Sequence, residues 1–181
     1  RIGELAQGRE VLDVFSYAGG FSVHALAGGA AAVTSLDVSA PALEQARSNA
    51  RLNDLDASRH ATLAEDAFVA LEQLARSERE FDIVIVDPPS FAKSDKEIPG
   101  ALAAYRRINK LALPLVAPGG VLLAASCSAR VSADDFFRTV EAVLHASGRG
   151  FKLLDKTYHG VDHPIGFPEG AYLKSGYYRM H

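Results

Sequence analysis

The sequence predicts one α/β domain built on a doubly wound, mostly parallel sheet of seven strands, with helices on both faces. Short apolar runs alternate with amphipathic stretches along all 181 residues. The strongest run, residues 81–86, is rich in β-branched side chains, which is typical of a strand buried on both faces of a parallel sheet. The last two expected strands are separated only by a loop, which predicts an antiparallel hairpin at the C-terminal end.

Three strand–helix units are expected in the first half of the chain. The strands are predicted at 11–15, 32–36 and 61–64, and the helices at 21–30, 39–53 and from 67 onward. Ser39 favours a helix start because its hydroxyl can accept a bond from a first-turn N–H, and Pro41 fits that turn.

The second half continues the alternation and ends with the hairpin. Strand 81–86 must stop at Pro88 and Pro89, because neither proline can donate to the ladder. The spacing of Ser132 and Asp135 resembles a capping box at the start of a helix. The remaining elements are helices over about 97–113 and 134–147, a breaking segment at 118–120, and strands at 121–125, 151–155 and 172–179.

Composition excludes several classes of protein. Nineteen Lys and Arg against 22 Asp and Glu give a net charge of −3, so bulk charge provides no strongly cationic nucleic-acid surface. Cys127, the only cysteine, cannot form an internal disulfide and suits a reducing cytosol, so we expect a cytoplasmic protein. We expect no membrane segment, no signal peptide and, from the histidine spacing, no metal site. Because the chain begins with Arg1 and not Met, we also expect a fragment of something longer.

Ligands of such sheets bind beyond the carboxyl ends of the strands. At the first of these ends, paired glycines precede a helix, where a ligand can approach backbone N–H groups closely. The turn is neither a G-x-G-x-x-G motif nor a P-loop, and a plain strand–helix turn is the alternative. It comprises Phe15, Ser16, Tyr17, Ala18, Gly19 and Gly20.

Acidic residues follow the next two strands. Asp37 can accept both ribose hydroxyls of an adenosine moiety, although a helix entry has the same sequence. Asp66 can accept a hydrogen bond from an adenine amino group. The alternative role for Asp66 is an N-cap for the helix that begins at Ala67.

The fourth and fifth strand ends are more distinctive. Pro88 and Pro89 would hold Asp87 in place at low entropic cost, and Phe91 can either stack on a planar substrate or belong to the core. Cys127 lies between two serines at the rim of the sheet, where a reactive thiol and an inert buried one are both consistent with the pattern.

Together these motifs resemble those of class I S-adenosylmethionine-dependent methyltransferases, and in detail the RlmI-like large-subunit ribosomal RNA cytosine-5 methyltransferases. The resemblance covers nearly the whole chain and is carried by residues 15–22, 33–37, 87–91, 126–128, 162–164 and 168–174. It implies a Rossmann-like methyltransferase sheet, S-adenosylmethionine as cofactor and large-subunit ribosomal RNA as partner. Family members also carry an N-terminal RNA-binding PUA domain and a β-hairpin-rich linker domain, so residues 1–181 are expected to be the catalytic C-terminal domain.

The resemblance also implies residue roles. Cys127 would be the nucleophile and Asp87 a second catalytic group. Cofactor contacts are expected from residues 15–20, Asp37, Val38, Asp66, Ala67 and Asp87, and substrate contacts from Pro88, Pro89, Phe91 and Lys93. Ala18 stands where relatives more often have Thr, and Ser90 means that the second, product-releasing cysteine of another RNA cytosine-5 group is absent.

A thiol suits cytosine-5 chemistry because carbon 5 is a poor nucleophile in an aromatic ring. Thiolate addition at carbon 6 makes carbon 5 able to attack a sulfonium methyl group. An ordinary thiol has a pKa near ~8.5, so we expect the site to lower it or to activate the thiol on binding. Asp87 can hydrogen-bond the N3/N4 edge of the base, which must reach the pocket unstacked.

Three other functions remain open from the sequence. An amino-group methyltransferase acting on adenine or guanine uses a D/N-P-P-aromatic motif, but here Ser90 separates the aromatic residue from the prolines. A non-catalytic cofactor-binding RNA module and a small-molecule methyltransferase are the others. Self-association into a homodimer is also left open.

Overall fold

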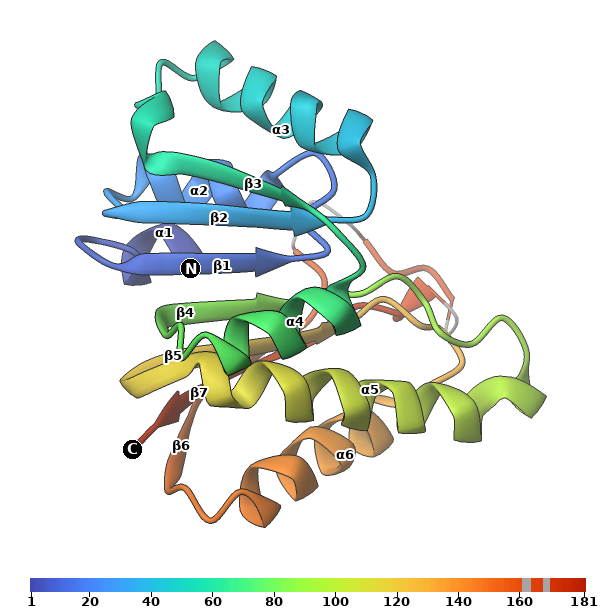
Figure 1. Ribbon diagram of the computed structural model, residues 1–181. Coiled ribbons are helices and arrows are strands. Elements are labelled where there is room, and N and C mark those ends of the chain that lie inside the picture. Colours follow the sequence, from blue (N-terminus) through green and yellow to red (C-terminus); the bar gives the residue numbers. More distant parts are fainter. Residues whose placement is uncertain (161–163, 168–169) are drawn as a thin grey trace.

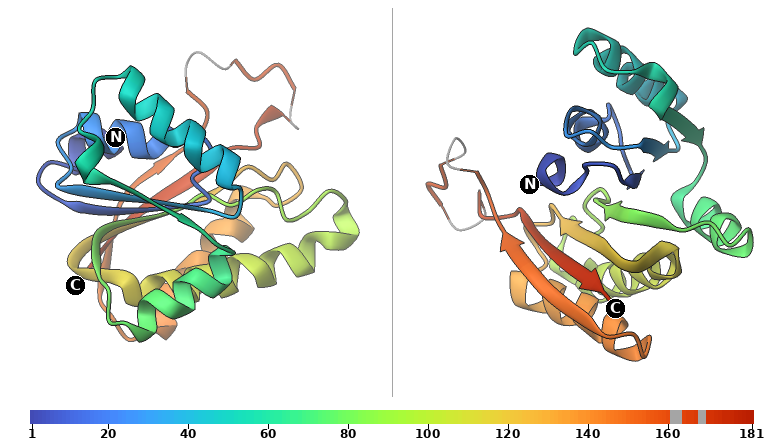
Figure 2. Two further views of the ribbon diagram at one scale, coloured as in Figure 1. Left: turned by 45° about the horizontal axis from the view of Figure 1, so that its top comes forward. Right: turned by 90° about the vertical axis from the view of Figure 1, so that its left-hand side faces the viewer.

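The computed structural model describes residues 1–160, 164–167 and 170–181 and contains a seven-stranded sheet in the order β3-β2-β1-β4-β5-β7-β6 (Figure 1). The strands β1 to β5 run parallel, whereas β7 lies between β5 and β6 and is antiparallel to both (Figure 2). The doubly wound sheet with a closing hairpin is therefore confirmed. The strands are β1 Glu10–Val14, β2 Ala32–Asp37, β3 His60–Ala64, β4 Phe81–Val86, β5 Val116–Ser126, β6 Phe151–Thr157 and β7 Lys174–Met180.

Helices cover both faces of the sheet, as Figures 1 and 2 show. Side chains alternate along β1, so that Leu12 and Val14 join the apolar cluster under α4 to α6, while Val11 joins the cluster under α1 to α3. The α-helices of the described residues are α1 Ile2–Leu5, α2 Gly20–Ala27, α3 Ala40–Leu52, α4 Ala67–Arg76, α5 Ile98–Ala112 and α6 Ala133–Ala146. None of them is long and apolar enough to span a membrane.

Several element boundaries differ from the prediction. Helix α1 was not expected, and α2 ends three residues early because Gly28 caps it and Gly29 adopts a left-handed φ of 83°. Phe15 lies outside β1, since its φ of 64° turns the chain away from the sheet. Strand β5 begins at Val116 rather than 121, so the segment 118–120 interrupts the pairing within a strand.

The predicted helix starts at Ser39 and Ser132 are confirmed. The Ser39 hydroxyl accepts a hydrogen bond from the Ala42 N–H (3.3 Å), and the Ser132 hydroxyl accepts one from the Asp135 N–H (3.1 Å). The Ser132 hydroxyl also donates to the Asp135 carboxylate (2.8 Å), so the two side chains bond each other directly.

Candidate active site

The turn between β1 and α2 is built from unusual backbone conformations. Phe15, Tyr17 and Gly19 all have positive φ values, of 64°, 48° and 77°. A Cβ on Gly19 would lie 2.7 Å from the Cβ of Ala46 in α3, whereas a Cβ on Gly20 would meet nothing within 4 Å. Gly19 is therefore required by the turn and its packing, and Gly20 leaves open space beside the first N–H groups of α2.

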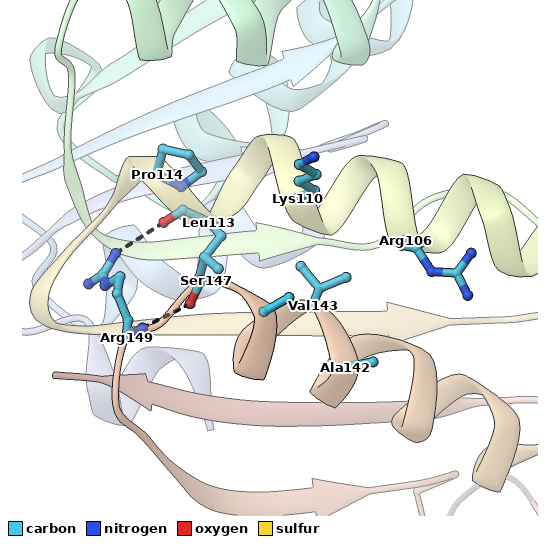
Figure 3. Close-up of a pocket in the computed structure, with 9 residues that line it drawn as sticks. Arg106, Lys110, Leu113, Pro114, Ala142, Val143, Ser147 and Arg149 are labelled. Atoms are coloured by element: carbon cyan, nitrogen blue, oxygen red, sulfur yellow. Dashed lines mark hydrogen bonds between the residues drawn. The ribbon is translucent and has the colours of Figure 1, made fainter.

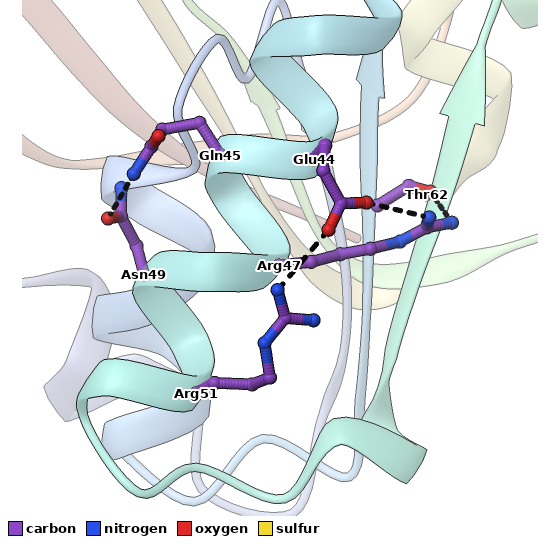
Figure 4. A network of polar contacts seen from close by, with 6 residues as sticks. All are labelled: Glu44, Gln45, Arg47, Asn49, Arg51 and Thr62. Atoms are coloured by element: carbon purple, nitrogen blue, oxygen red, sulfur yellow. Dashed lines mark hydrogen bonds and ion pairs between the residues drawn. The ribbon is translucent and has the colours of Figure 1, made fainter.

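Helix α3 holds this turn in place. The Asn49 side chain donates a hydrogen bond to the Ala18 carbonyl (2.9 Å), and Gln45 donates to the Asn49 side-chain oxygen (3.0 Å). Figure 4 shows this pair on α3 beside the ion pairs of Glu44 with Arg47 and Arg51. Asn49 was not expected at the site, and no sequence pattern indicated this contact.

Asp37 connects the turn to the end of β2. Its carboxylate accepts hydrogen bonds from the backbone N–H groups of Tyr17 and Ser39, both at 2.9 Å. Each carboxylate oxygen has a second lone pair, so the group can still accept from a ligand. Tyr17, whose backbone N–H bonds Asp37, and Val38, the next residue in the chain, are 73% and 75% exposed.

Asp66 caps α4. One oxygen of its carboxylate accepts hydrogen bonds from the N–H groups of Phe68 (3.0 Å) and Val69 (3.2 Å), and Ala67 is buried as the first residue of the helix. The alternative interpretation as an N-cap is therefore correct. Its contact with a cofactor stays a prediction.

Asp13 is a site residue that the sequence analysis did not single out. Its side chain is 1% exposed, and one oxygen accepts from the Ser22 N–H (3.0 Å) and hydroxyl (2.6 Å). The other oxygen is buried without a partner. Burial raises the pKa of Asp13 to about 7, with smaller contributions from Asp87 and Asp37. A lone acid inside an apolar strand was the signal that could have identified it.

Asp87 lies at the end of β4 next to the buried Pro88 and the exposed Pro89. No described residue hydrogen-bonds its half-buried carboxylate, and burial raises its pKa. Phe91 packs edge-to-face on Tyr105, with ring centroids 5.0 Å apart, so it belongs to the edge of the core. Its stacking on a substrate stays a prediction.

Cys127 follows β5 and faces the end of β4. Its half-buried thiol lies 3.8 Å from the Pro88 carbonyl oxygen, to which it donates a weak hydrogen bond. Burial, followed by the charge of Asp87, raises the pKa of the thiol, while the backbone N–H of Cys127, the Lys174 ammonium and the Ser90 N–H act against this shift. The expectation that the site itself lowers the thiol pKa is wrong, which leaves activation on substrate binding.

Other predicted or prominent features lie apart from this cluster. Lys93 is exposed, and its backbone N–H donates to Glu97 (2.6 Å). The motif segments at 162–164 and 168–174 fall partly outside the described residues. Among the residues that the structure describes, no group of acidic, histidine or cysteine side chains could hold a metal ion. A cavity of about 670 Å³ lies between α5 and α6, and Figure 3 shows Arg106 and Lys110 at it.

A family model described as S-adenosylmethionine-dependent methyltransferase matches residues 1–159. The chain belongs to this family. Its similar proteins include a "Ribosomal RNA large subunit methyltransferase" of Deinococcus radiodurans, 43% identical over 99% of this chain and 44% of the relative. The "Ribosomal RNA large subunit methyltransferase I" of Aeromonas salmonicida is 41% identical over 96% of this chain and 44% of the relative. This methyltransferase chain thus spans about half the length of the curated relatives that it matches.

Solved structures of methyltransferases share this fold. A methyltransferase complexed with SAH superposes with a TM-score of 0.87 and is 26% identical, covering 98% of this chain and 47% of that one. The cofactor of the family, S-adenosylmethionine, fits the residues described above, because the open space at Gly20, the spare lone pairs of Asp37 and the unpartnered oxygen of Asp13 gather at one rim.

Proposed function

We propose that this chain is the catalytic domain of a large-subunit ribosomal RNA methyltransferase that forms 5-methylcytosine through a covalent bond to Cys127. The observation that carries the proposal is the position of the Cys127 thiol, 3.8 Å from the Pro88 carbonyl and beside the unpaired Asp87. The names of the two curated relatives support the ribosomal RNA substrate. Cytosine-5 chemistry is supported by the presence of a thiol at this rim.

The proposed roles follow from the chemistry of each group. The Cys127 thiolate adds to carbon 6 of cytosine, and Asp87 hydrogen-bonds the N3/N4 edge as charge develops there. S-adenosylmethionine, when bound, supplies an electrophilic methyl group. Loss of the carbon-5 proton to a base then lets the Cys127 sulfur leave carbon 6 and restores the aromatic ring. Because the resting thiol has a raised pKa, substrate binding must complete its ionisation.

An amino-group methyltransferase is the second candidate. It is favoured by the free Asp87 carboxylate followed by two prolines, an arrangement suited to gripping an exocyclic amino group. That reaction has no use for a thiol, so Cys127 distinguishes the two functions.

The test compares Cys127→Ala with the wild type, each in the context of the complete protein, on ribosomal RNA that lacks the modification. We expect the variant to keep its affinity for S-adenosylmethionine and to lose methyl transfer. RNA containing 5-fluorocytidine should become covalently trapped on the wild type alone, since fluorine at carbon 5 cannot be abstracted. Ser128→Ala is the matched control, because its buried hydroxyl oxygen has no partner. Normal methylation by Cys127→Ala would contradict the covalent mechanism and favour the amino-group reaction.

A further inference from the structure

Lys174, the first residue of β7, is a buried lysine. Its side chain is 2% exposed, although lysine is almost never fully buried unless it is paired. The antiparallel register of β5 and β7 places Lys174 directly opposite Ser126, the residue before Cys127. A buried charge therefore lies next to the proposed nucleophile.

The ammonium group of Lys174 holds the turn that follows Cys127. It donates hydrogen bonds to the backbone carbonyls of Ser128, Val131 (2.7 Å) and Tyr172 (3.1 Å). These three acceptors match the three N–H donors of an ammonium group, so the geometry favours the charged form. No proton acceptor is left on the nitrogen, so Lys174 is unsuited to be the base that removes the carbon-5 proton.

Neutral carbonyls satisfy the donors of Lys174 but do not neutralise its charge. No described carboxylate forms an ion pair with it, and a buried charge without a counter-charge is costly. The charged or titratable groups that act on the Cys127 site are Asp87 at the end of β4, Tyr105 in α5 and Lys174 in β7. Of these only Lys174 carries a positive charge, and the charge of Cys127 raises the pKa of Lys174 against the effect of burial.

We propose that Lys174 is a positioning residue for Cys127, whose buried ammonium group fixes the turn after the cysteine and supplies the counter-charge for a thiolate. The proposal deepens the proposed function, on which it rests, by assigning the group that stabilises the ionised nucleophile. Burial lowers the pKa of Lys174 to about 8, so the ammonium form prevails at neutral pH.

The test measures how the rate of alkylation by iodoacetamide depends on pH. Cys127 is the only thiol of this chain, so the profile reports its ionisation directly. We expect Lys174→Met to slow alkylation roughly tenfold at pH 7, where the wild-type Lys174 is charged and favours the thiolate. Above about pH 9, where Lys174 has lost its proton, the two rates should converge. Arg149→Met is the matched control, because Arg149 also holds backbone carbonyls, those of Leu113 and Val116, but far from the thiol. A folded Lys174→Met variant with the wild-type alkylation rate at pH 7 would overturn the proposal.

A reciprocal measurement keeps the proposal testable if Lys174→Met fails to fold. Coupling between two sites acts equally in both directions. The wild-type thiol is still protonated where Lys174 titrates, so the comparison uses Cys127→Asp, whose carboxylate is ionised there. NMR titration should therefore show a lysine pKa about one unit higher in Cys127→Asp than in Cys127→Ala. Equal lysine pKa values would contradict the coupling. Neither measurement requires methyl transfer, so a catalytically unaffected Cys127→Ala variant would refute the covalent mechanism without deciding the role of Lys174.

Discussion

The backbone N–H of Tyr17 donates a hydrogen bond to the carboxylate of Asp37 at 2.9 Å, which ties the turn after β1 to the end of β2. Asp37 therefore orders the turn as well as offering lone pairs to a ligand. Changes at Asp37 should thus affect cofactor binding through both contributions.

Asp37→Ala should weaken binding of S-adenosylmethionine about tenfold to a hundredfold, corresponding to roughly 1–3 kcal/mol, because ribose hydroxyls would be left unpaired. Isothermal titration calorimetry measures this directly. Asp56→Ala is the control, since Asp56 also accepts from a backbone N–H, that of Ser58, in an exposed turn before β3. Unchanged affinity in Asp37→Ala would show that Asp37 does not contribute to cofactor binding.

Gly19 and Gly20 should respond in opposite ways to replacement by alanine. Gly19→Ala should lower the free energy of unfolding by on the order of 2 kcal/mol, because its φ of 77° disfavours a side chain and its Cβ would approach Ala46 to 2.7 Å. Gly20→Ala, at the start of α2, should leave stability unchanged or raise it by about 0.5 kcal/mol. Urea denaturation compares the two, and equal losses would contradict the packing argument.

Gly20→Ala should nevertheless weaken the binding of S-adenosylmethionine. Its Cβ would occupy the open space that we assign to S-adenosylmethionine. Calorimetry on this folded variant should show a lower affinity, and wild-type affinity would place the cofactor elsewhere.

Asp13 makes the stability of the chain depend on pH. Its folded pKa of about 7 lies above the ordinary value of 3.8, so between these values the folded chain retains a proton that the unfolded chain has lost. The contribution of Asp13 to stability is therefore fully present below about pH 4 and is lost as pH rises to about 7, at up to about 1.4 kcal/mol per unit. Asp13→Asn cannot titrate, so its stability relative to wild type should improve from pH 5 to pH 7.5. Parallel pH profiles in urea denaturation would show that Asp13 keeps an ordinary pKa.

Lys93 should contribute more to RNA binding than Lys110. Lys93 is exposed in the loop after β4 that also contains Asp87 and Phe91, whereas Lys110 lines the cavity between α5 and α6. Lys93→Ala should weaken binding and reduce the salt dependence by about one phosphate contact, and Lys110→Ala should do neither. Filter binding of a ribosomal RNA fragment across a salt series measures both, and equal effects would contradict this placement.

The acidic net charge predicts weak RNA binding by this chain. With 22 acidic against 19 basic residues the chain has no excess of cations to neutralise phosphates, and Arg107 is paired to Glu72 at 3.9 Å. At physiological salt we expect it to bind ribosomal RNA less tightly than the full-length Deinococcus radiodurans relative does. Equal affinities in filter binding would show that the catalytic domain recognises RNA unaided.

The amino-acid sequence alone predicts the strands, the closing hairpin and the rim at which Asp37, Asp87 and Cys127 gather. These features follow from local patterns, since apolar runs and breaking residues mark each strand and the carboxyl ends of parallel strands meet at one edge. The family resemblance also depended on contiguous motifs. Apart from helix α1, which was not expected, the errors in the fold lie at element ends, as at Val116, where pairing with β4 extends a strand past a Pro-Gly-Gly segment.

Which groups act on one another within that rim depends on how the folded chain packs. The contact of Asn49 with Ala18 spans 31 positions, and that of Lys174 with Ser128 spans 46. Such contacts depend on strand order and on how far a side chain is buried, and neither leaves a periodic trace in the sequence. For the same reason, the raised pKa values of Asp13 and Cys127 follow from desolvation in the assembled core, which residue type and spacing do not encode.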